Sequence, residues 1–128
     1  MQVLSPLLRR LRPHFVATLV GVTALLPTPA SAAESGAQGR VVRFSLNNTG
    51  SDEHASSHGS IAVRHSGNKL EVYSWGGTMC PASSLTDVEV LTLEHAFHNR
   101  QRTLLAPRFK FGEVKETRCL VGFELVAG

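Results

Sequence analysis

The sequence contains little cysteine, few aromatic residues and little charge. Of its 128 residues, 2 are Cys, 1 is Trp and 1 is Tyr, and only 18% are charged. Two cysteines are too few for a fold held together mainly by disulfides, and they cannot supply four thiolates to a structural zinc site. Because 42% of the residues are hydrophobic, the low charge does not indicate disorder. The length and composition predict one globular domain.

The sequence also lacks the patterns that mark common catalytic sites. It has no His-Glu-x-x-His run, no phosphate-binding glycine loop, no Cys-x-x-Cys pair and no recognisable catalytic triad. We therefore predict a non-enzymatic protein. Two enzymatic alternatives have no spacing argument behind them: a hydrolase that uses a histidine with Glu94 or Asp52, and a cysteine nucleophile with a histidine base.

The N-terminus has the three-part layout of a secretory signal. Arg9, Arg10 and Arg12 precede an apolar run at residues 15–26, and small residues follow up to Ala32. The apolar run has 12 residues, far fewer than the ~20 that a transmembrane helix needs. We expect residues 1–32 to be a signal peptide that is removed. The remaining protein is then periplasmic or extracellular and has no stable membrane anchor.

The excess positive charge lies entirely in this signal. The chain has a formal net charge of +3, and residues 1–32 contain three arginines and no acidic residue. The segment from Ala33 therefore has equal numbers of acidic and basic side chains. Because nucleic-acid-binding proteins rely on an excess of basic residues, we predict no nucleic-acid partner.

Hydrophobic patterning predicts an α+β domain over residues 40–128, after a flexible lead-in at residues 33–39. Alternation of apolar and polar residues indicates strands, and residues 66–68 have the composition of a tight hairpin turn. The order β-β-β-α-β-β predicts a small, mainly antiparallel sheet with one helix packed on one face. The expected elements are strands at 41–46, 61–64 and 69–75, a helix at 87–98, and strands at 103–111 and 118–126.

The helix has the clearest local signal. Thr86 and Glu89 have the spacing of a capping box, and Asn99 is placed for a left-handed stop. Apolar residues at spacings of three and four indicate the buried stripe, which consists of Val90, Leu93 and Phe97.

The alternation also predicts which strand residues face the core. In the first strand, Val42, Phe44 and Leu46 are expected on one side. In the last strand, one face is expected to contain Cys119, Val121, Phe123 and Leu125.

Cys80 and Cys119 are expected to form a disulfide, because exported proteins fold in oxidising compartments. The bond would close a loop of roughly 40 residues and stabilise the domain by about 4 kcal/mol in the chain-entropy model. It would hold the loop before the helix against the final strand.

Four histidines suggest a metal site. His54 and His58 lie in a polar loop, and His95 and His98 lie on the predicted helix. If the loop folded over the helix, their imidazoles would suit Zn²⁺ or Cu²⁺. The alternative is that these histidines are ordinary solvated side chains and that the protein has no cofactor.

The segment between the hairpin and the helix carries the only Tyr and Trp. Tyr73, Trp75 and Met79 lie close to Cys80, so a disulfide would hold them at a rigid surface suited to recognition. The alternative is that Trp75 and Met79 fold back and pack over the end of the helix and the gap left by Gly122. The leading hypothesis is an exported protein-binding module, such as an inhibitor, an immunity-type protein or an envelope accessory factor. The runner-up is an exported metal-binding protein.

Overall fold

The computed structural model describes residue 21, residues 32–114 and residues 116–128. Apart from residues 21 and 32, the predicted signal peptide lies outside the described residues. All strands, the helices and the disulfide belong to residues 34–128, so this segment contains its own complete core. No helix within the described ranges is long and apolar enough to cross a membrane.

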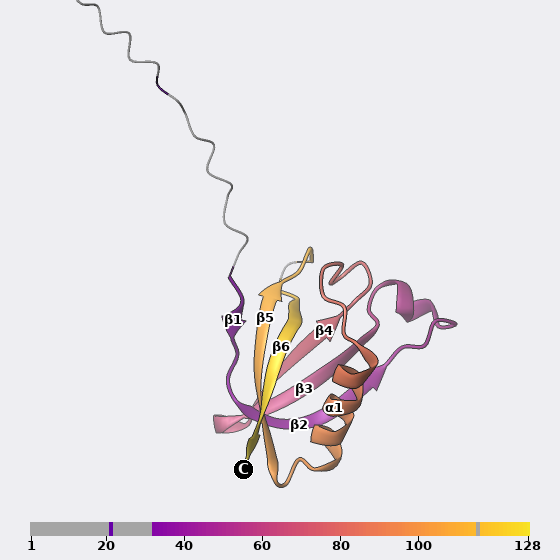
Figure 1. Ribbon diagram of the computed structural model, residues 1–128. Coiled ribbons are helices and arrows are strands. Elements are labelled where there is room, and N and C mark those ends of the chain that lie inside the picture. The colour runs from indigo at the N-terminus through magenta and orange to yellow at the C-terminus, as the bar shows by residue number, and fades with distance from the viewer. Residues whose placement is uncertain (1–20, 22–31, 115) are drawn as a thin grey trace, which may run out of the picture.

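Five strands form a closed, mixed β-barrel that is accompanied by one α-helix (Figure 1). Around the barrel the strands follow the order β5-β2-β3-β4-β6, and the circle is closed because β6 pairs with both β4 and β5. The short strand β1 pairs with β5 at the N-terminal edge. The elements are β1 Glu34–Ser35, β2 Gly39–Leu46, η1 Asp52–Ala55, β3 Gly59–His65, η2 Ser66–Asn68, β4 Lys69–Trp75, α1 Asp87–His98, β5 Thr103–Phe111 and β6 Arg118–Ala127.

The prediction of a small, mainly antiparallel open sheet is therefore wrong. β4 and β6 run parallel, with Tyr73 paired to Arg118 and Ser74 paired to Cys119. A parallel neighbour requires a long crossover, which the chain makes through α1 and β5. Alternation identified the strands, but it carries no information on which strands pair, so barrel closure could not be read from it.

The connection order of the barrel matches that of the OB-fold, a five-stranded Greek-key barrel. As in that fold, the helix lies between the third and fourth barrel strands, here β4 and β5. Such connectivity describes the path of the chain and assigns no function by itself.

Two β-bulges change which residues face the core. In β2, Val41 is opposite Val63 and Arg43 is opposite Ala62, so Val42 is the extra residue. Val41 is consequently buried. The predicted alternation had placed Val41 on the other side of the strand from Phe44. The predicted face of Val42, Phe44 and Leu46 is wrong for this reason, and Leu46 is 53% exposed.

The second bulge lies between β5 and β6. Phe109 is opposite Leu120 and Arg108 is opposite Gly122, which leaves Val121 as the extra residue. Leu120 and Phe109 are buried in the core, and Val121 is 40% exposed. Cys119 is opposite Lys110 and lies on the outer face with it. The predicted common face of Cys119, Val121, Phe123 and Leu125 is therefore wrong.

The helix α1 begins as predicted. The Thr86 hydroxyl accepts a hydrogen bond from the Glu89 N–H, and the Glu89 carboxylate accepts one from the Thr86 N–H. The helix ends at His98, but Asn99 has a φ of −103° and is not left-handed. Its side-chain amide instead donates to the His95 carbonyl at 3.0 Å.

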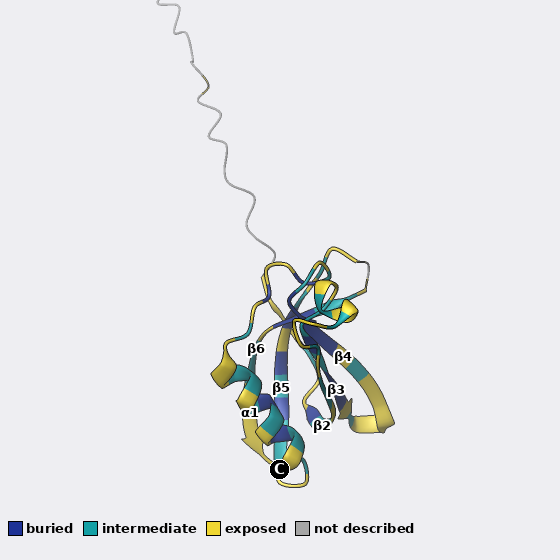
Figure 2. Cartoon of the chain, turned by 90° about the vertical axis from the view of Figure 1, so that its right-hand side faces the viewer, coloured by how far each residue is buried: buried dark blue, intermediate teal, exposed yellow. Residues whose placement is uncertain are grey.

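The core lies inside the barrel and under α1. Burial is greatest along the middle of the barrel strands and decreases toward the β3–β4 hairpin tip (Figure 2). The helix packs mainly against β2 and contributes Leu93 and Ala96 to the core. The barrel strands contribute the other buried residues, which are Val41, Ile61, Val63, Tyr73, Trp75, Leu105, Phe109 and Leu120.

The predicted disulfide between Cys80 and Cys119 is present. The two Cα atoms are 5.5 Å apart, and 39 positions separate the cysteines in sequence. Cys119 is paired with Ser74 across the β4–β6 seam, and Cys80 follows β4 after one turn. The bond therefore joins the chain just after β4 to the beginning of β6.

Replacing both cysteines by serine should lower the free energy of unfolding by about 4 kcal/mol, because a loop of roughly 40 residues is then no longer closed in the unfolded chain. Urea unfolding followed by Trp75 fluorescence measures this change. Reduction of the parent protein should reproduce it, and reduction of the double variant should have no effect. An unchanged midpoint in the double variant would contradict the stabilising role.

Candidate functional site

The structure places Tyr73 and Trp75, two of the predicted partner-binding residues, in the barrel core. Their exposed fractions are 0% and 2%. The Trp75 ring packs against Phe44, with ring centroids 6.5 Å apart, and a Cβ on Gly59 would overlap Trp75. Both side chains therefore stabilise the fold, which is the alternative considered for Trp75.

Met79 has a different environment. It is partly exposed and borders an open cleft of about 340 Å³ beside β4. The cleft is lined by Leu70, Glu71, Val72, Ser74, Met79, Glu116, Thr117 and Arg118. Of the three predicted partner-binding residues, Met79 alone reaches the surface.

The hydroxyl of Tyr73 is part of a polar cluster at the edge of the core. It donates to a carboxylate oxygen of Glu71 at 2.9 Å. The same carboxylate is 3.6 Å from His65 Nε2 and 3.8 Å from Arg118 Nε. Arg118 also covers the ring of Phe109, 5.5 Å from its centroid. These charges are neutralised within the fold.

Burial raises the pKa of Tyr73 well above its usual value, and the hydrogen bond to Glu71 adds to the shift. The negative charge of Glu71 raises it further, and Arg118 partly opposes the shift. Tyr73 is therefore held in its neutral form, as a hydrogen-bond donor and a core side chain.

A groove with exposed apolar walls lies over the disulfide. It has a volume of about 300 Å³. Phe111 and Val121 line it and are 55% and 40% exposed, and Lys110 and Glu113 supply one charge of each sign. We call it the disulfide groove, and its lining consists of Cys80–Ser83, Lys110–Glu113, Cys119 and Val121.

The wall of the groove that follows β4 is held by backbone geometry. Gly76 and Gly77 have φ values of 71° and 67°, which non-glycine residues rarely adopt. The turn is then closed by hydrogen bonds from the Gly76 N–H to the Ser83 carbonyl and from the Cys80 N–H to the Gly76 carbonyl. The Ser83 hydroxyl donates to the Leu120 carbonyl and ties this wall to β6.

The opposite wall is formed by the end of β5. A Cβ at position 112 would meet the Met79 carbonyl and the Cys119 sulfur, so glycine is needed for this close approach. The Phe111 ring is held edge-on against Phe109, with centroids 5.4 Å apart, and Arg118 lies over it. Contacts within the fold therefore hold both walls in place.

The sequence pattern did not identify the exposed residues of this groove. Val121 was expected on a core face, and its exposure depends on the β5–β6 bulge. Phe111 is the last residue of β5, and no feature of its pattern distinguishes it from Phe109. The proximity of Cys80 was the one signal that pointed to this region.

The four predicted metal-binding histidines lie in two separate pairs. His54 and His58 stack with ring centroids 4.2 Å apart, and His54 Nδ1 is 2.9 Å from the Asn47 carbonyl. Figure 1 places η1, which carries His54, near the upper end of the barrel and the C-terminal end of α1 near the lower end.

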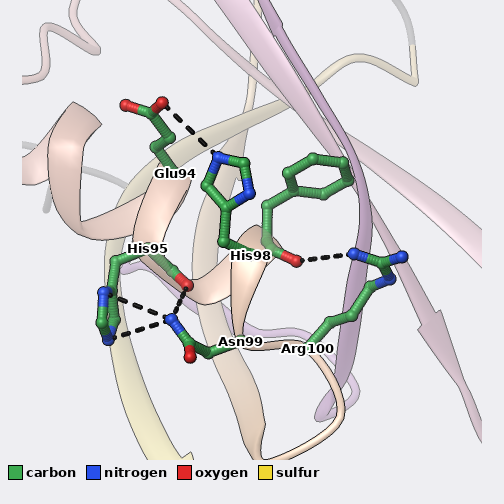
Figure 3. Close-up of polar contacts among 6 residues, drawn as sticks. Glu94, His95, His98, Asn99 and Arg100 are labelled. Carbon is green, nitrogen blue, oxygen red and sulfur yellow. Dashed lines mark hydrogen bonds and ion pairs between the residues drawn. The ribbon is translucent and has the colours of Figure 1, made fainter.

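The other pair is exposed on the last turn of α1 (Figure 3). His98 Nε2 is 3.6 Å from a carboxylate oxygen of Glu94, four residues earlier on the helix, and His95 is close to the Asn99 amide. In the described part of the chain, no group of three or more metal-ligating side chains lies close enough to hold an ion. Zinc or copper binding by these histidines stays a prediction.

Cys80 and Cys119 are bonded to each other, so the hypothesis of a cysteine nucleophile is wrong. Asp52 is exposed in η1, and Glu94 lies 3.6 Å from His98. The hydrolase alternative stays a prediction.

Comparison of the chain with protein-family models, curated protein sequences and solved structures finds no match. The geometry of the protein itself is therefore the basis for a functional proposal.

Because Tyr73 keeps its proton more tightly in the folded than in the unfolded protein, its contribution to stability is complete below about pH 10 and is lost as the pH rises above that value. An alkaline titration should show tyrosinate absorbance appearing together with the loss of folded Trp75 fluorescence. Tyr73 is the only tyrosine, so the signal has one source. In Tyr73→Phe, stability should be lower at neutral pH and should decrease less between about pH 10 and 12. Free titration of Tyr73 near its ordinary pKa in the folded protein would contradict its burial.

Proposed function

We propose that the protein is an exported, non-enzymatic binding module that holds a partner protein in the disulfide groove. The observation that carries the proposal is the exposure of Phe111 and Val121 on walls that are fixed by the disulfide and by backbone hydrogen bonds. An ordered groove loses little conformational entropy when it binds. Large exposed apolar side chains in such a groove are typical anchors of protein interfaces.

The disulfide also supports the proposed location. Stable disulfides form in the periplasm and outside the cell and are rare in the cytosol. The bond between Cys80 and Cys119 agrees with the export that the N-terminal signal pattern predicts. The partner is therefore expected in the same compartment, and the roles of inhibitor, immunity-type protein and envelope accessory factor all meet this condition.

The charges of the groove favour a protein over a charged small molecule. Lys110 and Glu113 give its rim one positive and one negative group, and the remaining lining residues are neutral. Partners with a small apolar side chain and a mixed polar border match this pattern better than phosphates or polyanions.

A photo-reactive residue at position 111 should crosslink the partner in the intact periplasmic or secreted fraction. The same residue at position 88 is the control, because Val88 is 72% exposed on α1 and is not one of the residues that line the groove. A crosslinked product specific to position 111 supports the proposal, and its identity names the partner. Equal labelling from both positions would contradict it.

With the partner in hand, Phe111→Ser and Val121→Ser should each weaken binding roughly tenfold or more, because they remove apolar anchors. Neither side chain belongs to the barrel core, so the unfolding midpoint should change little. Val88→Ser is the matched control and should bind as the parent does. Isothermal titration calorimetry measures the affinities, and a loss of binding equal in all three variants would overturn the assignment.

A further inference from the structure

A second surface, on the outer face of β2, β3 and β4, carries an unusual concentration of arginine. Across β2, β3 and β4, Arg40 lies opposite Arg64, and Arg64 lies opposite Leu70. In the next row Arg43 and Val72 flank Ala62, whose side chain is buried. Directly opposed residues of antiparallel strands share one face of the sheet, so these five side chains lie together. We call them the arginine face.

The arginine face points away from the core. Val41 and Val63 lie opposite each other between its two rows, and both are buried inside the barrel. Side chains that alternate with them along the strands must point outward. Arg43 and Arg64 are exposed, and Leu70 and Val72 are each 44% exposed.

The opposition of two arginines does not stabilise the fold. Like charges directly opposite each other on paired strands reduce stability, and Arg40 and Arg64 form such a pair. Arg40 donates a hydrogen bond to the carbonyl of Arg100, and the Arg100 guanidinium lies over the Phe97 ring. Within the described ranges, neither Arg43 nor Arg64 forms an ion pair. Their charges are available to a partner.

The arginine face is positive although the segment from Ala33 is neutral in total. None of the residues in its rows is acidic, and the next row consists of Ser45, Ser60 and Ser74. Leu70 and Val72 also border the cleft beside β4, whose acidic residues are Glu116 and Glu71, the latter already paired with Arg118. The positive charge of the face therefore lies on its β2 and β3 side, at Arg40, Arg43 and Arg64.

We propose that the arginine face binds the surface of a membrane that contains anionic lipids. Basic side chains are attracted to anionic headgroups, and exposed aliphatic side chains such as Leu70 and Val72 enter the boundary between headgroups and acyl chains. The positive charge of the face favours an anionic partner. The exposed side chains of Leu70 and Val72 on the same face favour a lipid surface over other anionic partners. Binding of this kind is peripheral and reversible.

Nucleic acid fits the same face less well. Proteins that bind single strands stack the bases on aromatic side chains, and the only Tyr and Trp of this chain are buried in the core. The major groove of a duplex admits a helix or a two-stranded ribbon, and the arginine face is a three-stranded sheet surface. Binding to nucleic acid is therefore an outcome of the test and not the proposal.

Co-sedimentation with lipid vesicles tests the proposal. The oxidised segment from Ala33 is suitable, because it contains the whole barrel and lacks the apolar run of residues 15–26. It should bind phosphatidylcholine vesicles that contain phosphatidylglycerol and should not bind pure phosphatidylcholine vesicles. Added salt should weaken binding, since screening shortens the range of the attraction. Equal binding to both vesicle types, or tighter binding to single-stranded DNA than to the anionic vesicles, would overturn the proposal.

Substitutions locate the binding surface. Arg43→Gln and Arg64→Gln should each weaken vesicle binding about fivefold, which corresponds to about 1 kcal/mol for each basic residue near an anionic surface. Leu70→Ser should also weaken it. Arg108→Gln is the matched control, because it removes the same charge from β5, where Arg108 lies over Gly122. Equal effects of Arg64→Gln and Arg108→Gln would show dependence on net charge only and would overturn the assignment of the face.

Two further measurements are needed. The first distinguishes membrane binding by the arginine face from a structural role of its arginines, and the second distinguishes it from binding at the disulfide groove. The unfolding midpoint of Arg64→Gln should equal or exceed that of the parent, because the substitution removes repulsion from Arg40; a lower midpoint would indicate a structural role. Phe111→Ser should bind vesicles as the parent does, so a failure of the disulfide groove as a protein site and a failure of the arginine face are observed independently.

Discussion

Closure of the barrel depends on the seam between β4 and β6. This seam consists of the Tyr73–Arg118 and Ser74–Cys119 pairs, and the disulfide lies directly beside it. The other neighbours of β6 are on β5, where pairing continues along the whole strand. Without the disulfide, the short parallel pairing of β4 with β6 alone would have to offset the conformational entropy lost when the long crossover between these strands is closed. The disulfide therefore defines where the circle of strands is closed.

The same bond links the fold to the proposed site. Because Cys80 and Cys119 lie under the groove, the feature that closes the barrel also fixes both groove walls. Phe111 and Val121 are exposed next to a rigid base, and Trp75 is left to the core. Trp75, which the sequence suggests as a recognition residue, thus packs in the core. Phe111 is the aromatic residue exposed at the groove.

Local features of the fold were predictable from the sequence, and long-range ones were not. The capping box of Thr86 and Glu89 and the hairpin turn at 66–68 depend on neighbouring residues, so short patterns contain the necessary information. The bulges at Val42 and Val121 depend on how two strands twist against each other, and alternation within one strand does not record this. The exposure of Val121, one of the two large apolar residues exposed in the groove, could not be inferred for that reason. The disulfide was predictable because two cysteines allow a single pairing.

The order of elements along the chain has a consequence for biogenesis. β6 pairs with both β4 and β5, and residues 118–127 follow every other strand of the barrel. During synthesis, Cys80 is therefore made well before its partner, and the barrel stays open until the last strand arrives. In that interval Cys80 has no disulfide partner, and β4 and β5 have unpaired edges. The pairing of β6 and the disulfide are thus both completed only when residues 118–127 are in place.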